Sequence, residues 1–216
     1  MIKELGLQNS IFNEFLRQVR DEKIQKDRLR VRRNMERLGE IFAYELSKTL
    51  DYETADVTTP LGSAVMRVPK EIPVLATILR AGLPFHQGFL NYFDSADSAF
   101  VSAYRKHLKN EEDFEVKVEY LSSPDLDGRE LVIADPMLAT GTSMALVYKA
   151  LLEERGKPSH IHVCALLASA EGIAHVRKNL PENHTIWVGA IDDELTAQAY
   201  IVPGLGDAGD LCYGKK

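Results

Sequence analysis

Apolar runs alternate with amphipathic segments from residue 72 to residue 191. Runs typical of strands covered on both faces lie at 72–79, 130–134, 160–168 and 184–191. Further strands are predicted at 98–104 and at 114–121, where apolar and polar residues alternate as on a half-exposed strand. Helices are predicted at 83–92, 144–154 and 170–180. Because strands and helices alternate, the pattern predicts an α/β fold with a parallel sheet flanked by helices.

Residues 1–70 have a different pattern. A helix capped by Asn9 or Ser10 would carry its apolar residues on one face, namely Ile11, Phe12, Phe15, Leu16 and Val19. Asp27 can cap a second helix, whose apolar residues keep helical spacing as far as Leu46. Residues 57–69 combine Pro60 and Gly62 with β-forming residues, which predicts an irregular hairpin arm outside the main sheet.

These segments predict a single domain over residues 1–216. N-terminal helices and a β-arm occupy 1–70, the α/β core occupies 71–192, and a C-terminal loop occupies 193–216. The N-terminus lacks the apolar core of a signal peptide, and no stretch approaches the ~18 apolar residues of a membrane span. We therefore expect a soluble, cytoplasmic protein with no membrane partner.

Composition narrows the classes of partner. The formal net charge is −6, with 27% charged residues, so no general affinity for nucleic acid is expected. Between Arg17 and Arg37 lie nine basic and four acidic residues, which form either a solvated helix face or a subunit or effector surface. Cys164 and Cys212 are not in a CxxC pair, so we expect neither a disulfide framework nor a zinc site.

The stretch VIADPMLATGTSM (132–144) places an acid and a Thr-Gly turn between a strand and a helix. Exposed N–H groups and the positive end of the dipole make a helix start an anion site, and Gly141 lets those N–H groups converge. The spacing is neither GxxxxGKS/T nor GxGxxG, which disfavours ATP and dinucleotide sites. Asp135, about five residues before this nest, suits the hydroxyls of a ribose 5-phosphate. The alternative is ordinary capping of a turn and a helix.

Two segments lie at the ends of other predicted strands. TILRAGLPF (77–85) places Arg80-Ala81-Gly82 after a buried strand, where the arginine could pair with phosphate oxygens and the small residues let backbone approach a ligand. A commonplace turn is the alternative. AYRKHLKNEEDFE (103–115) is rich in charge from Lys106 to Asp113 and has little to bury, which indicates a mobile segment or a solvated loop.

The tail AYIVPGLGDAGDLCYG (199–214) combines glycines, Pro203 and two acids, Asp207 and Asp210, without a helix or strand period. Apolar anchors such as Ile201 and Leu205 favour an ordered loop over a free terminus. Its glycines would expose backbone N–H and C=O groups to a ligand.

DPMLATGTS resembles the PRPP-binding loop of type I phosphoribosyltransferases, where PRPP is 5-phospho-α-D-ribose 1-diphosphate. The single acid at Asp135 resembles the uracil branch of this family. ILRAGL resembles the pyrophosphate loop, AYRKHLKNEEDFE the segment that closes over PRPP, and YIVPGLGDAGD the uracil-binding signature. The chain departs from the family pattern at Thr77 (usually proline), at Thr142 (usually glycine) and at Lys215 (usually threonine).

The resemblance implies a type I phosphoribosyltransferase-like fold with a C-terminal base-binding hood, converting uracil and PRPP to UMP and diphosphate in pyrimidine salvage. The implied catalytic residues are Asp135, Arg80, Arg105 and Asp207. The implied PRPP contacts are Arg80, Ala81, Gly82, Arg105, Asp135, Pro136, Met137, Leu138, Ala139, Thr140, Gly141, Thr142, Ser143 and Asp207. The implied uracil contacts are Ile201, Gly206, Asp207 and Ala208. The resemblance also implies a non-proline cis peptide near Arg80, Mg²⁺ held mainly by PRPP and diphosphate oxygens without a set of protein ligands, GTP as an effector, and a homodimer or homotetramer.

Base choice follows from the hydrogen-bonding edge of the base. Uracil presents an acceptor, a donor and an acceptor, which a backbone offering N–H, C=O and N–H would match. Cytosine would leave two such contacts unpaired, so it should be rejected. A phosphoribosyltransferase of other base specificity, an RNA-binding regulator of the same fold, and a catalytically silent nucleotide-binding scaffold remain alternatives.

Overall fold

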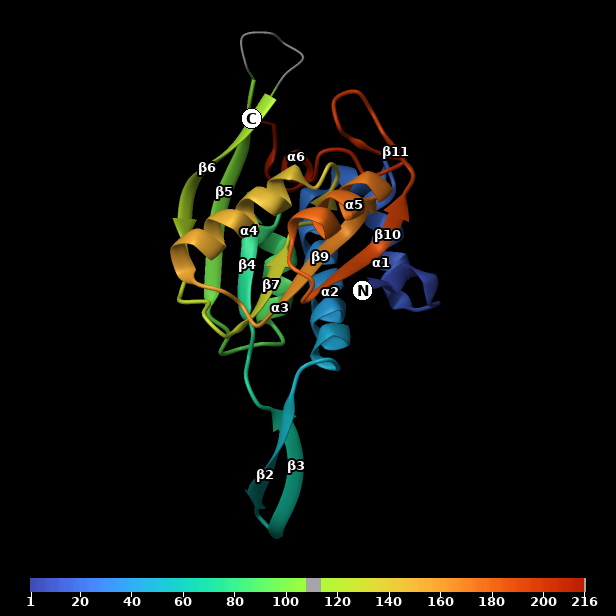
Figure 1. The fold of residues 1–216 in the computed structure, drawn as a ribbon. Helices are drawn as coiled ribbons and strands as arrows, with labels where there is room; N and C mark the ends of the chain where they lie inside the picture. Colours follow the sequence, from blue (N-terminus) through green and yellow to red (C-terminus); the bar gives the residue numbers. More distant parts are fainter. Residues whose placement is uncertain (108–113, 216) are drawn as a thin grey trace.

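The computed structural model describes the backbone of residues 1–107 and 114–215, and the side chains of all these residues except 104–107 and 114–117. A main sheet runs in the order β1-β10-β9-β7-β4-β5-β6, with β8 beside β9 (Figure 1). Its strands are β1 (Ile2–Glu4), β4 (Val74–Leu79), β5 (Ser98–His107), β6 (Phe114–Ser122), β7 (Glu130–Ala134), β8 (Met137–Leu138), β9 (His160–Ser169) and β10 (His184–Asp192).

The prediction of a mostly parallel α/β sheet is confirmed. All neighbouring pairs in this sheet are parallel except β5 and β6, which are antiparallel. Only residues 108–113 separate β5 from β6 in the chain, whereas a parallel pairing would require a crossover of about a dozen residues or more. β5 continues through Arg105, which pairs in register with Val116, so the strand ends three residues later than the sequence predicts.

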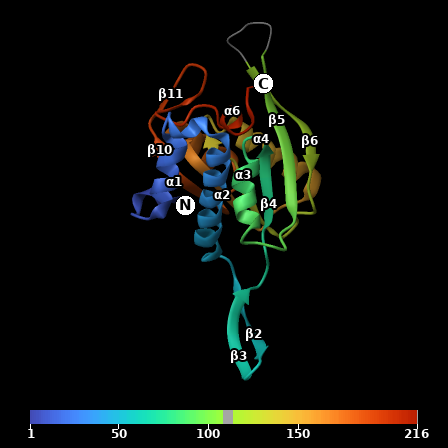
Figure 2. The ribbon, with the colours of Figure 1, turned by 180° about the vertical axis from the view of Figure 1, so that it is seen from behind.

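Helices cover both faces of the sheet. α4 (Thr142–Arg155) and α5 (Ala170–Asn179) lie on the face toward the viewer in Figure 1. α1 (Ile11–Arg20), α2 (Arg28–Ser47) and α3 (Leu83–Leu90) cover the opposite face, as Figure 2 shows. A separate apolar core fills each interface, so the buried strands have apolar residues on both sides.

The predicted helix caps are present. The side chain of Ser10 accepts from the Phe12 N–H, and that of Asp27 accepts from the Arg30 N–H. Ile11 is the exception on the predicted apolar face of α1, since it is 61% exposed while Phe12 is buried. It stands in the first turn, beyond the edge of the core.

The arm is a regular antiparallel hairpin instead of the irregular one predicted. β2 (Tyr52–Thr59) and β3 (Gly62–Pro69) pair without a register shift from Tyr52↔Pro69 to Thr59↔Gly62. They form their own sheet, and the arm projects from the end of the molecule opposite the C-terminal segment (Figure 1).

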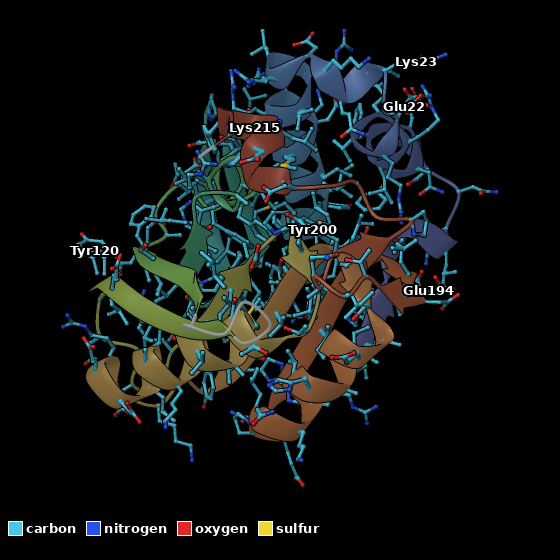
Figure 3. The ribbon with its side chains drawn as sticks, turned by 90° about the horizontal axis from the view of Figure 1, so that it is seen from above. Glu22, Lys23, Tyr120, Glu194, Tyr200 and Lys215 are labelled. Atoms are coloured by element: carbon cyan, nitrogen blue, oxygen red, sulfur yellow. The ribbon has the colours of Figure 1, made fainter. Side chains whose placement is uncertain are left out.

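The tail contains regular structure that the sequence pattern did not predict. β11 (Glu194–Leu195) pairs with β12 (Ile201–Val202), and α6 (Ala208–Tyr213) follows. Seen from above in Figure 3, the tail near Lys215 lies against the N-terminal helices, over the end where the parallel strands finish. Short 3-10 turns, η1 (Leu5–Leu7) and η2 (Ile24–Lys26), complete the fold. None of the described helices is long and apolar enough to cross a membrane.

Candidate functional site

The turn after β4 brings Arg80 beneath the tail. The Leu79–Arg80 peptide is cis. Gly82 follows in a crowded place: a Cβ there would collide with the Thr77 hydroxyl and would lie 3.0 Å from the Ala134 carbonyl oxygen. A side chain at Gly82 would therefore push the turn away from the end of β7.

The guanidinium of Arg80 joins this turn to the C-terminal helix. Arg80 Nη2 donates to Asp210 Oδ1 at 3.1 Å and to the Gly214 carbonyl oxygen at 3.0 Å. Arg80 Nε is buried and has no partner among the described residues. A buried donor without an acceptor costs about 1–3 kcal/mol, so a ligand oxygen at this point would be stabilised.

Asp135 stands where β7 ends. Its backbone N–H donates to the Cys164 carbonyl oxygen at 3.0 Å, and its Oδ1 accepts from the Met137 N–H at 3.4 Å. Burial raises the pKa of the Asp135 carboxyl to about 7, and the Met137 N–H opposes this shift only in part. The carboxyl can therefore change its charge near neutral pH.

The segment between Asp135 and α4 contains the two-residue strand β8, which the sequence did not predict. β8 pairs with Leu167 and Ala168 of β9, so the Pro136–Ala139 backbone is fixed against the sheet. The Leu138 side chain is buried in the core. Only the backbone of Leu138 is therefore free to serve a ligand.

Gly141 turns the chain into α4. It has φ +76°, and a Cβ there would lie 2.7 Å from the Gly172 carbonyl oxygen and 3.2 Å from His175 Cβ. The N-cap residue, Gly141, has no side chain to cap α4, and the Thr142 N–H makes only a long contact, at 3.5 Å, to Thr140 Oγ1. The N–H groups of Thr142 and Ser143 begin this helix, and such groups lack helical carbonyl partners. The arrangement is suited to one phosphate.

The departure at Thr142 has a structural consequence. The Thr140 hydroxyl donates to Thr142 Oγ1 at 3.1 Å, so the two hydroxyls of the turn are linked. Ser169, the last residue of β9 and the N-cap of α5, also supports the turn, since its Oγ donates to the Ala139 carbonyl oxygen at 2.5 Å.

The tail brings its predicted residues over the same edge. Val202–Pro203 is a cis peptide, Gly206 has φ +91°, and a Cβ on Gly206 would meet nothing within 4 Å. Asp207 caps α6 by accepting from the Asp210 N–H at 2.8 Å. A Cβ built on Gly209 would lie 3.2 Å from Asp207 Oδ1 and 3.7 Å from Arg80 Nε, which places both charged groups close to Gly209.

The structure thus brings Arg80, Asp207 and the Asp135 turn to one edge of the sheet. Thr77 Oγ1 donates to the Ala134 carbonyl oxygen at 3.2 Å and so links the ends of β4 and β7. Ile201 and Ala208 are buried beside this edge. The side chain of Arg105 and the charge-rich residues 108–113 lie outside the described part of the chain.

The sequence pattern did not predict a role for Asp210 or for Arg32. Arg32 Nη1 donates to the Cys212 carbonyl oxygen at 2.7 Å and holds the end of α6 against α2. The only local signal for Asp210 was its place three residues after an N-capping acid. The partner of Arg32 lies 180 residues away and left no local signal.

The chain is similar to known proteins over nearly its whole length. A family model described as uracil phosphoribosyltransferase matches residues 7–215. A uracil phosphoribosyltransferase from Porphyromonas gingivalis is 55% identical over 212 residues, covering 98% of this chain and 97% of the relative. One from Methanothermobacter thermautotrophicus is 39% identical over 186 residues, with 85% and 83% covered. A solved structure of a protein from Aquifex aeolicus superposes with a TM-score of 0.86 at 29% identity, with 99% and 98% covered.

Proposed function

Because the chain belongs to the uracil phosphoribosyltransferase family, we propose that it converts uracil and PRPP to UMP and diphosphate. A bond forms between uracil N1 and ribose C1, the bond from C1 to the diphosphate oxygen breaks, and the N1 proton is lost. The observation that carries this proposal is the union of two segments: the arginine turn after β4 is bonded to the tail through Asp210 and Gly214.

The turn into α4 is the proposed site of the ribose 5-phosphate. Its support is the start of a 14-residue helix after a glycine at φ +76°, where the Thr142 N–H makes only a 3.5 Å contact to Thr140 Oγ1. The side chains of Thr140, Thr142 and Ser143 add hydroxyl groups there. The backbone of Pro136–Ala139, fixed by β9, would set the distance between phosphate and ribose.

Asp135 is the proposed acceptor for the ribose hydroxyls. In its ionised form it is an acceptor only, which suits two neighbouring hydroxyl donors. The C1–O bond breaks through an oxocarbenium-like state, so a negative carboxylate near the ribose also favours the positive charge that develops.

Arg80 is the proposed partner of the diphosphate leaving group. Its Nε lies buried without an acceptor among the described residues, and a diphosphate oxygen would supply one. Ala81 and Gly82 leave room for the backbone to approach the same group. We propose that Arg105 contributes a second positive charge from β5, as the family pattern implies.

The backbone from Ile201 to Ala208 is the proposed uracil site. Gly206 supports this assignment because its positive φ turns the peptide groups of the tail and leaves open space beside its Cα. Asp207, at the start of α6, would orient the ribose or a water on the metal. Backbone N–H and C=O groups at fixed positions would match the edge of uracil and leave cytosine with unpaired polar groups.

Mg²⁺ is the proposed cofactor, bound mainly through PRPP and diphosphate oxygens, where it would neutralise charge on the leaving group. Among the described residues, no group of three His, Cys, Asp or Glu side chains could hold a metal ion. Asp135 and Asp207 are the carboxylates available to orient its waters.

We propose a homodimer or homotetramer, with the arm as part of a subunit contact. The support is the exposed apolar side chains on the arm: Val57 is 41% exposed, Leu61 100%, Val65 68% and Met66 52%. GTP as an effector and a cytoplasmic location follow from the sequence and the resemblance, and both stay proposals, as does the single domain over residues 1–216.

The proposed reaction is tested by following UMP and diphosphate from PRPP, uracil and Mg²⁺, with and without GTP. The expected result is equal amounts of both products, dependent on PRPP and Mg²⁺. Diphosphate release without UMP, or no product with purified full-length protein, would contradict the proposal.

A further inference from the structure

An ion pair between Arg20 and Asp192 lies at the base of the tail. Arg20 is the last residue of α1 and Asp192 the last of β10. Arg20 Nη1 donates to Asp192 Oδ2 at 2.8 Å, and Arg20 Nη2 donates to Asp192 Oδ1 at 2.9 Å. The side chains are 23% and 7% exposed. Such a bidentate, shielded pair has one geometry, because both planar groups must stay parallel.

Both members of this pair also bind the backbone of Gly204. The Gly204 N–H donates to Asp192 Oδ2 at 2.9 Å, and Arg20 Nη1 donates to the Gly204 carbonyl oxygen at 3.2 Å. One ion pair therefore satisfies both backbone polar groups of one residue. Figures 1 and 2 both show α1 beneath the loop that carries β11, at the same side of the molecule.

Gly204 is a position that only glycine fits. Its φ is +57°, and a Cβ there would collide with the Ile201 carbonyl oxygen. The next residue, Leu205, is 3% exposed and packs into the core. Gly204 is fixed by the ion pair, and Leu205 is fixed by packing in the core. The position of Gly206 therefore depends on the position of Gly204.

The other half of the tail has separate anchors. Arg32 holds the Cys212 carbonyl oxygen, Asp207 caps α6, and Arg80 binds Asp210. None of these contacts involves Arg20 or Asp192. Loss of the ion pair should therefore move Gly204 and Gly206 more than it moves Asp207.

We infer that Arg20 and Asp192 are positioning residues for uracil: by clamping Gly204 they fix the tail backbone that reads the base. This inference rests on the proposed uracil contact at Gly206. Neither side chain touches the substrates; each acts through Gly204.

The test is steady-state kinetics on Arg20→Lys, with uracil and PRPP varied in turn. Lysine keeps a positive charge opposite Asp192, but one ammonium group cannot make the fork and also reach the Gly204 carbonyl oxygen. We expect the KM for uracil to rise about tenfold, the effect of one charged hydrogen bond, while the KM for PRPP changes less than about twofold. Arg17→Lys is the matched control on the same helix, since Arg17 pairs with the exposed Glu14, and it should leave both constants unchanged.

Two results would overturn the inference. An unchanged KM for uracil in Arg20→Lys is one. The other is a parallel rise of both KM values with a lower melting temperature, which would show a purely structural role. Gly206→Ala separates the inference from its premise: alanine is strained at φ +91° but collides with nothing. A raised KM for uracil in Gly206→Ala with an unchanged Arg20→Lys refutes the clamp alone, whereas an unchanged Gly206→Ala refutes the uracil site and the clamp together.

Discussion

Arg80 and Asp210 are 130 residues apart in the chain, and a 3.1 Å hydrogen bond joins them. Through this contact the turn after β4, which carries the proposed diphosphate partner, is fixed to α6 of the tail, the proposed uracil site. Because the side chains are 33% and 35% exposed, their pairing adds little to the free energy of folding, at most about 1 kcal/mol. Its effect should instead be on the orientation of the guanidinium.

Asp210→Ala should lower kcat/KM for PRPP about tenfold, because Arg80 loses a charged acceptor that orients it. Asp210→Asn keeps an acceptor oxygen and should lose less than about threefold. The measurement is PRPP-dependent initial velocity. Asp97→Ala breaks a comparable pair with Arg129 at the amino ends of β5 and β7 and should leave activity unchanged. Equal kcat/KM for Asp210→Ala and the parent chain would refute the orienting role.

The raised pKa of Asp135 predicts that PRPP use depends on pH near neutrality. Only the ionised carboxyl is a pure acceptor, and burial places its pKa at about 7 in the free protein. We expect kcat/KM for PRPP to decrease as the pH is lowered below about 7. The much slower Asp135→Asn variant should not show this decrease. If kcat/KM for PRPP still decreases at low pH in Asp135→Asn, the decrease is due to another titrating group.

The same substitution should change the pH dependence of unfolding. The folded pKa of Asp135, about 7, lies above the ordinary value of 3.8, so the folded state holds the proton more tightly. Stability of the ligand-free chain should therefore decline as pH rises from about 4 to about 7. Asp135→Asn should lack this contribution and melt higher than the parent at pH 8. A lower melting temperature for Asp135→Asn at pH 8 would contradict a raised pKa for this carboxyl in the folded chain.

Gly141→Ala should damage both stability and PRPP use. Alanine at φ +76° costs about 1 kcal/mol or more, and its Cβ would also press on the Gly172 carbonyl oxygen. Gly128→Ala is the control: Gly128 has φ +72° with nothing within 4 Å of a Cβ, so it carries the backbone cost alone. Gly141→Ala should have a lower free energy of unfolding in chemical denaturation and a higher KM for PRPP than Gly128→Ala. Equal PRPP constants for the two would remove Gly141 from the phosphate site.

Asp207 has two roles that substitution can separate. Serine can replace the N-cap of α6 but cannot supply a carboxylate. We expect Asp207→Ser to keep the melting temperature of the parent while its KM for PRPP rises. Asp207→Ala should lose both, with a stability cost of about 1 kcal/mol for the cap. Unchanged PRPP dependence in both variants would show that Asp207 is only a cap.

The sequence predicted what repeats locally. Buried strands such as 130–134 and 184–191 carry continuous apolar runs, and the capped starts of α1 and α2 carry Ser10 and Asp27. Strands and helices of two to six residues were not predicted, namely β1, β8, β11, β12 and α6, because so few positions cannot show a periodic pattern. The antiparallel direction of β6 was missed for a different reason, since strand direction depends on the connection and not on the apolar pattern.

For the site, motif resemblance placed Arg80, Asp135 and Asp207 at one edge of the sheet, and the family match over residues 7–215 confirms the resemblance. The roles of these residues stay predictions. Contacts between distant segments left no local pattern: Arg20 meets Asp192 172 residues later, and Arg80 meets Asp210. Such pairs can be recognised only from the folded structure.

Recognition of the uracil edge by the tail backbone is tested most directly by comparing kcat/KM for uracil and for cytosine at saturating PRPP. Side-chain-free recognition predicts rejection of cytosine by about 10⁴-fold or more, because two buried polar contacts would be left unpaired. If kcat/KM for cytosine is within about tenfold of that for uracil, backbone recognition of the base edge is contradicted. Loss of a single hydrogen bond exposed to solvent would be enough to explain such a small difference.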